Sequence, residues 1–185
     1  MTASSYPDGT PVARTILVLV GLPASGKSTY ASKLLRSEPD RWIRVSRDDL
    51  RAMIVAADYA HAARPTREEL LRQIKFDIAR AALRLGFDVI LDDTHLFPGA
   101  LERVHDFAKA VAAEGTELKI VQKCFPVALE QCLNRNARRP ASVRPPRRVL
   151  LRMATVIEDR PDLLSYRETI YRPLRFNETR RKADQ

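Results

Sequence analysis

Residues 16–28 read Ile16-Leu17-Val18-Leu19-Val20-Gly21-Leu22-Pro23-Ala24-Ser25-Gly26-Lys27-Ser28. The first five residues are aliphatic, which is typical of a buried strand, and the next eight fill every fixed position of the G-x-x-x-x-G-K-[ST] pattern. In this pattern a glycine-rich turn presents backbone N–H groups to an anion, and the helix that follows adds the partial positive charge of its N-terminus. A plain glycine turn is the alternative, but it requires neither the lysine nor the serine. The stretch therefore predicts a binding site for the phosphates of a nucleoside triphosphate.

The side chains of this loop have distinct expected roles. Lys27 would reach the β- and γ-phosphates of ATP or GTP as a point charge, and Ser28 would place its hydroxyl group on Mg²⁺ or another divalent cation. The loop residues that we expect to bind the nucleotide are Gly21, Ala24, Ser25, Gly26, Lys27, Ser28 and Thr29.

The composition is that of one ordinary folded domain. The chain has 185 residues, of which 45% are hydrophobic, so it can bury a single core. Lysine and arginine number 32 against 23 acidic residues, which gives a net charge of +9. This excess indicates a polyanionic partner, although a solvated arginine surface would also produce it. The sequence leaves the oligomeric state open.

The cysteines and the apolar segments exclude several classes of protein. Cys124 and Cys132 form no C-x-x-C pattern, so we expect no disulfide framework and no zinc site, and a reducing, cytoplasmic setting. The apolar run that begins at Ile16 is too short to span a membrane, and we expect no membrane association.

Strand and helix signals alternate along the chain, which is the pattern of an α/β fold with a parallel sheet covered on both faces. We expect about four strands, at residues 16–20, 42–46, 87–91 and 118–125. We expect helices at residues 28–36, 48–55, 66–85, 98–114, 127–137 and 146–158. Residues 1–14 would be a disordered leader, 15–171 the domain and 172–185 a charged tail.

The long helix at residues 66–85 has the clearest local signals. Thr66 and Glu69 are spaced as in a capping box, and Gly86 is typical of the residue that ends a helix. The residues of its expected buried face recur at helical spacing and are Leu70, Ile74, Ile78, Ala81 and Leu85.

Functional residues of parallel sheets lie at the carboxyl ends of the strands, and two of these ends carry paired acids. Phosphoryl transfer needs a carboxylate to take the proton of the attacking hydroxyl group, together with a metal ion. Asp48 or Asp49 would be this base, although Asp48 could instead cap the helix that begins there. Asp93 would hold Mg²⁺ through water or orient Ser28.

Arginines supply the cations that such a reaction needs. Arg51 lies one helical turn after Asp48 and would grip a phosphate of the acceptor; a solvated helix arginine is the alternative. Residues 135–148 would form an Arg-rich helical lid over the transferring group, with a solvated basic helix end as the alternative for some of them. The arginines of this segment are Arg135, Arg138, Arg139, Arg144, Arg147 and Arg148.

Together these motifs resemble the kinase domain of the polynucleotide 5′-kinases of the phage polynucleotide kinase type, which have a P-loop kinase fold. Residues 21–29 are similar to the phosphate loop of that family, and Arg47-Asp48-Asp49-Leu50-Arg51 is similar to its R-D-D-x-R segment. Asp93-Thr94 resembles its D-T-N, and Arg135-Asn136-Ala137-Arg138-Arg139 resembles its R-N-x-x-R. The likeness keeps its order and spacing over residues 16–153.

On the donor side, the resemblance implies that Lys27 and Ser28 bind the phosphates and Mg²⁺. It implies that Arg139 is the lid arginine on the donor phosphates, and Arg135 is expected to join it in binding the nucleotide. Asp93 would support the catalytic centre.

On the acceptor side, the resemblance implies that Asp48 is the general base on a 5′-hydroxyl group and that Arg51 and Thr94 contact the 3′-phosphate side. His95 stands where the family often has Asn, and it would either contact the acceptor or make a structural hydrogen bond. Pro140 also departs from the pattern. The chain has no D-x-D-G-T nucleophile segment, so we expect no phosphatase activity.

The sequence thus predicts a kinase that transfers the γ-phosphate of ATP or GTP, with Mg²⁺, to the 5′-hydroxyl ends of DNA or RNA. The alternative is a small-molecule phosphotransferase acting on a nucleoside, sugar or antibiotic, since the same scaffold serves many acceptors. A nucleotide-binding switch or a nucleic-acid adaptor is a third possibility, but a binding protein needs no base at Asp48.

Overall fold

The structure is a computed structural model that describes residues 13–54 and 65–173. Most of the expected leader and tail, and Val55 at the end of an expected helix, lie outside these ranges. The strands are β1 (Arg14–Val20), β2 (Trp42–Val45), β3 (Asp88–Leu91), β4 (Leu118–Cys124) and β5 (Arg167–Tyr171). The helices are α1 (Lys27–Ser37), α2 (Arg47–Ile54), α4 (Pro65–Arg84), α5 (Ala100–Ala113), α6 (Leu129–Ala137) and α7 (Arg147–Asp159), with short 3-10 helices η1 (Ala141–Val143) and η2 (Pro161–Leu164).

The sheet has the strand order β2-β3-β1-β4-β5, and its first four members are parallel. The predicted α/β fold with a parallel sheet is therefore confirmed, and each expected strand and helix is found within a few residues of its expected bounds. The fifth strand was not predicted. β5 pairs antiparallel with β4 at the edge of the sheet, and its residues are exposed or only partly buried. An edge strand needs no apolar run, so local sequence did not reveal it.

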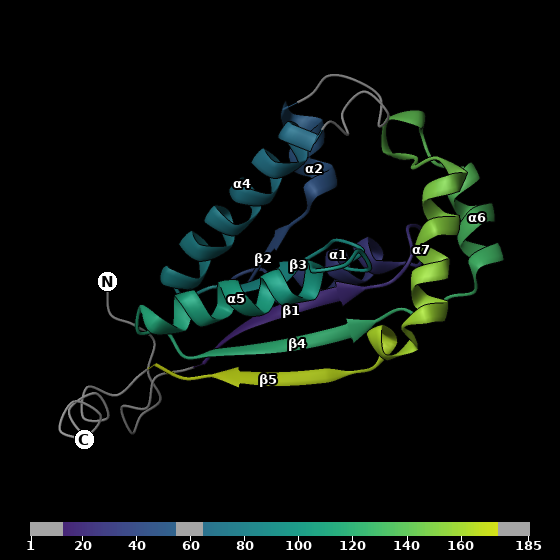
Figure 1. Cartoon of the computed structure of the whole chain (residues 1–185). Coiled ribbons are helices and arrows are strands. Elements are labelled where there is room, and N and C mark those ends of the chain that lie inside the picture. The colour runs from purple at the N-terminus through teal and green to yellow at the C-terminus, as the bar shows by residue number, and fades with distance from the viewer. Residues whose placement is uncertain (1–12, 55–64, 174–185) are drawn as a thin grey trace.

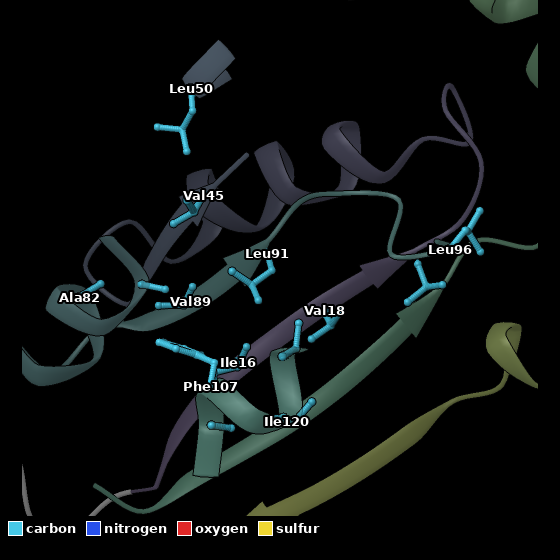
Figure 2. Packing of buried hydrophobic residues seen from close by; sticks show 14 of the residues in the cluster. Ile16, Val18, Val45, Leu50, Ala82, Val89, Leu91, Leu96, Phe107 and Ile120 are labelled. Atoms are coloured by element: carbon cyan, nitrogen blue, oxygen red, sulfur yellow. The ribbon is translucent and has the colours of Figure 1, made fainter. Parts of the chain in front are cut away.

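Helices cover both faces of the sheet because side chains alternate along its central strand. Ile16 and Val18 of β1 belong to the larger core, which includes residues of α4, α5 and α7. Leu17 and Leu19 face the other way and pack with Ala31 of α1. Figure 1 shows α4 and α5 in front of the sheet and α1 behind it. Figure 2 shows the larger core, in which labelled side chains of β1, β3 and β4 gather around α5 and α4.

The buried face of α4 differs from the prediction. Leu70, Ile78, Ala81 and Leu85 of the predicted face are exposed and Ile74 is only partly buried, whereas the buried residues are Leu71, Lys75, Ala79, Ala82 and Leu83. Two apolar stripes run side by side along this helix, and the small Ala79 and Ala82 let the second stripe approach the sheet closely. Periodicity alone does not distinguish two such stripes.

The capping box predicted for α4 does not form, whereas the residue expected to end the helix is confirmed. The helix begins at Pro65, so Thr66 lies inside the first turn, where proline is favoured at the first position. Glu69 pairs with Arg72 instead of closing a capping box. Gly86 follows the helix with φ 92°, as expected for a residue that ends it.

The carboxyl ends of the parallel strands point toward α6 and α7, as Figure 1 shows. The phosphate loop, the start of α2 and the segment after β3 all lie at these ends. None of the helices within residues 13–54 and 65–173 is both long and apolar enough to span a membrane.

Candidate active site

A cleft of about 470 Å³ lies at the carboxyl edge of the sheet. The residues that line this cleft come from the phosphate loop, α2, α4, the segment after β3, α6 and α7. Of the residues predicted from sequence, those that line it are Ala24, Gly26, Lys27, Ser28, Thr29, Asp48, Arg51, Asp93, Thr94, Arg135 and Arg139. Three predicted residues, Gly21, Ser25 and His95, lie buried next to the cleft instead of lining it.

The phosphate loop adopts a conformation that depends on its two glycines. Gly21 has φ 150°, and a Cβ atom there would lie 2.9 Å from the carbonyl oxygen of Phe125. Gly26 precedes α1 with φ 100°, and no side chain caps this helix. The first residues of α1 line the cleft, and no capping side chain accepts from their backbone N–H groups. A helix N-terminus with uncapped N–H groups is an arrangement that binds phosphate.

Lys27 is buried and folds back onto its own loop. Its Nζ donates to the carbonyl oxygens of Gly21 at 2.9 Å and Leu22 at 2.6 Å. Burial lowers the pKa of Lys27 to about 8, although the negative charge of Asp92 partly opposes this shift. The ammonium group is thus still mainly protonated at neutral pH and is available to exchange its carbonyl partners for phosphate oxygens.

The two acids at the start of α2 occupy different environments. Asp48 lines the cleft, where its side chain is 49% exposed and accepts a hydrogen bond from Arg51 Nη1 at 2.6 Å. The side chain of Asp49 is 64% exposed, pairs with Arg44 at 2.5 Å and is not among the residues that line the cleft. Ser46 precedes the helix, and its Oγ accepts from the backbone N–H of Asp49 at 3.4 Å. The hydroxyl of Ser46 therefore takes the capping contact that was considered for Asp48.

Asp93 is buried among cations. Its Oδ2 accepts hydrogen bonds from Lys75 Nζ at 2.9 Å and Arg47 Nε at 3.1 Å. Burial alone would raise the pKa of Asp93, but Lys75 and Arg47 hold it well below its ordinary value. The carboxylate is therefore ionised and ties α2 and α4 to the end of β3. The neighbouring Asp92 lines the cleft, and its Oδ2 accepts from Arg44 Nε at 2.7 Å.

Arg51 is positioned by two acids. Its guanidinium group donates to Asp48 and, through Nη2 and Nε, to Glu68 Oε1 at 2.6 and 3.2 Å. Glu68 also lies 3.4 Å from Nη1 of Arg47. Sequence analysis missed Glu68 and Lys75, because nothing in the local pattern of α4 links them to residues that lie about 20 positions away in the chain.

His95 makes a structural hydrogen bond. Its backbone is left-handed with φ 51°, and its Nδ1 contacts the carbonyl oxygen of Leu19 at 2.8 Å. Burial lowers the pKa of His95 to about 3, so the ring is neutral and Nδ1 is the donor. The Nε2 atom lies 4.0 Å from Asp93 Oδ2. This geometry corresponds to the second of the two roles considered for His95; contact with an acceptor stays a prediction.

Four of the six arginines of residues 135–148 line a cavity, and Arg138 and Arg148 line neither of the two cavities concerned. Arg135 in the last turn of α6 and Arg139 just after this helix line the cleft together with the phosphate loop. Arg144 and Arg147 instead line a neighbouring cavity of about 520 Å³ between α6 and the start of α7, which shares Pro145 with the cleft. Asn136 is buried and donates from Nδ2 to the carbonyl oxygen of Pro145 at 2.9 Å, which joins the end of α6 to the start of α7.

The chain matches known proteins in sequence. A family model for AAA domains, AAA_33, matches residues 16–159. A protein of Autographa californica nuclear polyhedrosis virus, named as a bifunctional polynucleotide kinase/RNA ligase, is 28% identical over 139 residues. The match covers 70% of this chain but 19% of the viral protein, so the chain spans about a fifth of that relative.

Solved structures share the fold. A chain in the structure of the Pnkp1/Rnl/Hen1 RNA repair complex superposes with a TM-score of 0.74 at 24% identity, over 93% of this chain and 53% of the other. A chain in another structure of the Pnkp1/Rnl/Hen1 complex is 30% identical with a TM-score of 0.58, over 68% of this chain and 40% of the other. Kti12 of Chaetomium thermophilum, solved with ADP-AlF3, has a TM-score of 0.54 at 20% identity, over 76% of this chain and 79% of its own.

The family match begins in β1 and ends in α7. It therefore includes the phosphate loop, the acids of α2 and the arginines of α6, which together form the cleft. Because this match covers well over half of the chain, the protein belongs to the AAA_33 family of AAA domains.

Proposed function

We propose that this protein is a polynucleotide 5′-hydroxyl kinase that transfers the γ-phosphate of ATP or GTP to the 5′-hydroxyl end of DNA or RNA. The observation that carries the proposal is the placement of Asp48 and Arg51 in the same cleft as Lys27. A carboxylate that can accept a proton and a cation that can hold a phosphate thus face the loop that would hold the donor. The name of the viral relative supports the same reaction.

The donor would bind at the phosphate loop. The backbone N–H groups at the start of α1 and the ammonium group of Lys27 would hold the β- and γ-phosphates, with Arg135 and Arg139 approaching from α6. Arginine is suited to this position because its planar group contacts two phosphate oxygens at once. These cations would neutralise the charge that develops on the transferring group.

The residues present fit a divalent cation of the Mg²⁺ type. The hydroxyl group of Ser28 is exposed in the cleft, and Asp92 and Asp93 lie in the same lining. Within residues 13–54 and 65–173 no three His, Cys, Asp or Glu residues form a metal cluster, as is usual for Mg²⁺ bound mainly through phosphate and water. The ion would neutralise phosphate charge. Ser28 would hold it, and Asp92 joins Asp93 as a candidate because Asp93 already accepts from two cations.

The acceptor would bind on the side of α2. Asp48 would take the proton of the 5′-hydroxyl group while the hydroxyl oxygen forms a bond to the γ-phosphorus and the bond to the β-γ bridging oxygen breaks, releasing ADP or GDP. Arg51 and Thr94 would hold the phosphate on the 3′ side of the reacting nucleotide.

The free thiols of Cys124 and Cys132 support a reducing, cytoplasmic setting for this reaction.

The direct test is transfer of label from ATP, with Mg²⁺, to a panel of 5′-hydroxyl oligonucleotides, 3′-mononucleotides and free nucleosides. We expect the oligonucleotides and 3′-mononucleotides to be labelled. Label in the free nucleosides alone would favour a small-molecule phosphotransferase instead.

Asp48→Asn and Asp49→Asn form a matched pair for this assay, because both replace one acid of the same helix turn. Asp48→Asn is expected to lower kcat by about 10²-fold or more while the Kd for ATP stays nearly constant, since loss of a base affects the transition state and not donor binding. Asp49→Asn is expected to keep most activity. A reversed result would assign the base to Asp49.

A further inference from the structure

A second, smaller cavity of about 40 Å³ opens next to the main cleft. Arg47, Asp93, Thr94 and Phe97 line both spaces, so the two are contiguous on the acceptor side. The remaining walls come from α4, from His95 and from the start of α5. A group bound at Thr94 therefore has this cavity as its immediate neighbour.

The charge of the small cavity is strongly positive. Four cationic side chains line it, against the single carboxylate of Asp93, and these are Arg47, Arg72, Lys75 and Arg103. Arg47 and Lys75 are both engaged with Asp93. The positive charges of Arg72 and Arg103 are therefore in excess of what the cavity itself neutralises.

Arg72 and Arg103 make few ion pairs with other described residues. The ion pair that Arg72 forms is with Glu69, a side chain that is half exposed, and exposed ion pairs of this kind contribute little. Arg103 has no ion-pair partner among the described residues. Burial lowers the pKa of Arg72, and the nearby positive charges of Arg103 and Arg47 lower it further. The negative charge of Glu68 opposes this only in part, so the positive charges of Arg72, Arg103 and Arg47 lie close together.

The size of the cavity and the charges around it indicate which kind of ligand can bind there. A volume of about 40 Å³ is that of a few water molecules, so it can take the oxygens of one phosphate group but not a nucleobase. Ala100, the first residue of α5, lines the cavity, and no side chain caps this helix at Gly99. The helix N-terminus adds partial positive charge to the guanidinium groups. His95 lines the cavity too, but its ring is neutral and adds no charge.

We infer that Arg72 and Arg103 form a second phosphate subsite, which holds the next phosphodiester of a nucleic acid acceptor beyond the phosphate at Arg51 and Thr94. The inference rests on the proposed kinase function and extends it, since it gives the path by which the acceptor strand leaves the active site. The strand would run from Asp48 past Thr94 and Phe97 to the small cavity lined by α4 and α5. An acceptor with two phosphates then binds better than one with a single phosphate.

Two acceptors separate this subsite from the catalytic centre. A 5′-hydroxyl, 3′-phosphate mononucleotide carries one phosphate, and the corresponding dinucleotide carries a second. The assay measures kcat/KM for both, with ATP and Mg²⁺ saturating, in the wild type, Arg72→Ala, Arg103→Ala and the double variant. The matched control is Arg84→Ala, which removes the same charge from the far end of α4, where Arg84 is exposed and pairs with Glu114.

The wild type is expected to prefer the dinucleotide. The double variant is expected to lose about tenfold more kcat/KM on the dinucleotide than on the mononucleotide, because each charge-assisted contact to phosphate is worth several-fold in affinity. For a longer single-stranded acceptor, the slope of log affinity against log salt is expected to flatten by about 0.7 per lost contact. Arg84→Ala is expected to change neither quantity.

Equal losses of the double variant on both acceptors, or an unchanged salt slope, would overturn the subsite while leaving the kinase function intact. If the wild type phosphorylates neither acceptor, the kinase function itself fails, and the subsite fails with it. Arg72→Gln and Arg103→Gln serve as second variants should either alanine variant fold poorly, as judged by thermal unfolding.

Discussion

Replacing Lys75 by methionine is expected to destabilise the protein by about 3 kcal/mol. Lys75 is 4% exposed, and its ammonium group lies 2.9 Å from Asp93 Oδ2. Methionine keeps the length of the side chain but removes the charge, and it leaves the buried carboxylate with Arg47 as its remaining hydrogen-bonded cation. Breaking a buried ion pair by removing one partner costs about 3–5 kcal/mol, and we take the lower end because Arg47 remains.

The expected change is large enough to measure by several methods. For a protein of this size, 1 kcal/mol corresponds to a shift in Tm of about 2–4 °C, so Lys75→Met is expected to lower Tm by about 6–12 °C. Urea unfolding gives the free energy independently. Lys109→Met is the matched control, because Lys109 is an exposed lysine that pairs with Asp106, and its replacement is expected to change stability by less than about 0.5 kcal/mol.

The pH dependence has a defined sign. The pKa of Asp93 is held below its ordinary value, so this group contributes stability that is complete above about pH 4 and is lost as the pH falls further. Removing the Lys75 charge raises the pKa of Asp93 and therefore removes part of this contribution. The difference in stability between the wild type and Lys75→Met is expected to be largest near neutral pH and to shrink in acid.

A double-mutant cycle tests the reasoning most directly. Lys75→Met alone leaves the carboxylate of Asp93 without one of its cations. When Asp93→Asn removes that carboxylate, Lys75→Met no longer has this cost, so the two effects on stability are expected to be non-additive by about 1–3 kcal/mol. Strict additivity of the two substitutions, or a Lys75→Met variant as stable as the Lys109→Met control, would refute the idea that this ion pair holds α4 against the end of β3.

Three further predictions concern the phosphate loop. Lys27→Ala is expected to abolish phosphoryl transfer without loss of Tm, because it removes a desolvated charge; near-normal turnover would contradict the assignment of the loop. The Kd of ATP is expected to rise by up to about tenfold per pH unit above pH 8, as Lys27 in the free protein loses its proton, and titrations in Lys27→Ala should lack this rise. Gly21→Ala is expected to cost about 1–3 kcal/mol in urea unfolding, because φ is 150° and the new methyl group meets the Phe125 carbonyl oxygen; a variant of wild-type stability would show that the loop relaxes freely.

The sequence alone determined the parts of the protein whose physics is local. The phosphate loop is one contiguous stretch in which each residue type has a backbone or charge requirement, so its position and its neighbouring strand and helix could be predicted. The acids of α2 could be identified as candidates for the same reason, because they follow a strand whose end had to face the loop. The parallel sheet followed from alternating strand and helix signals.

Tertiary structure decided what depends on contacts between distant residues. Three features arise only when α2 and α4 meet the end of β3. These are the position of Asp48 rather than Asp49 in the cleft, the contact of Glu68 with Arg51, and the ion pair of Lys75 with Asp93. The same packing buried one of two apolar stripes on α4, and pairing with β4 made a strand of β5. A periodic pattern specifies that a helix has an apolar face, but the free energy of burial against a particular neighbour decides which face it is.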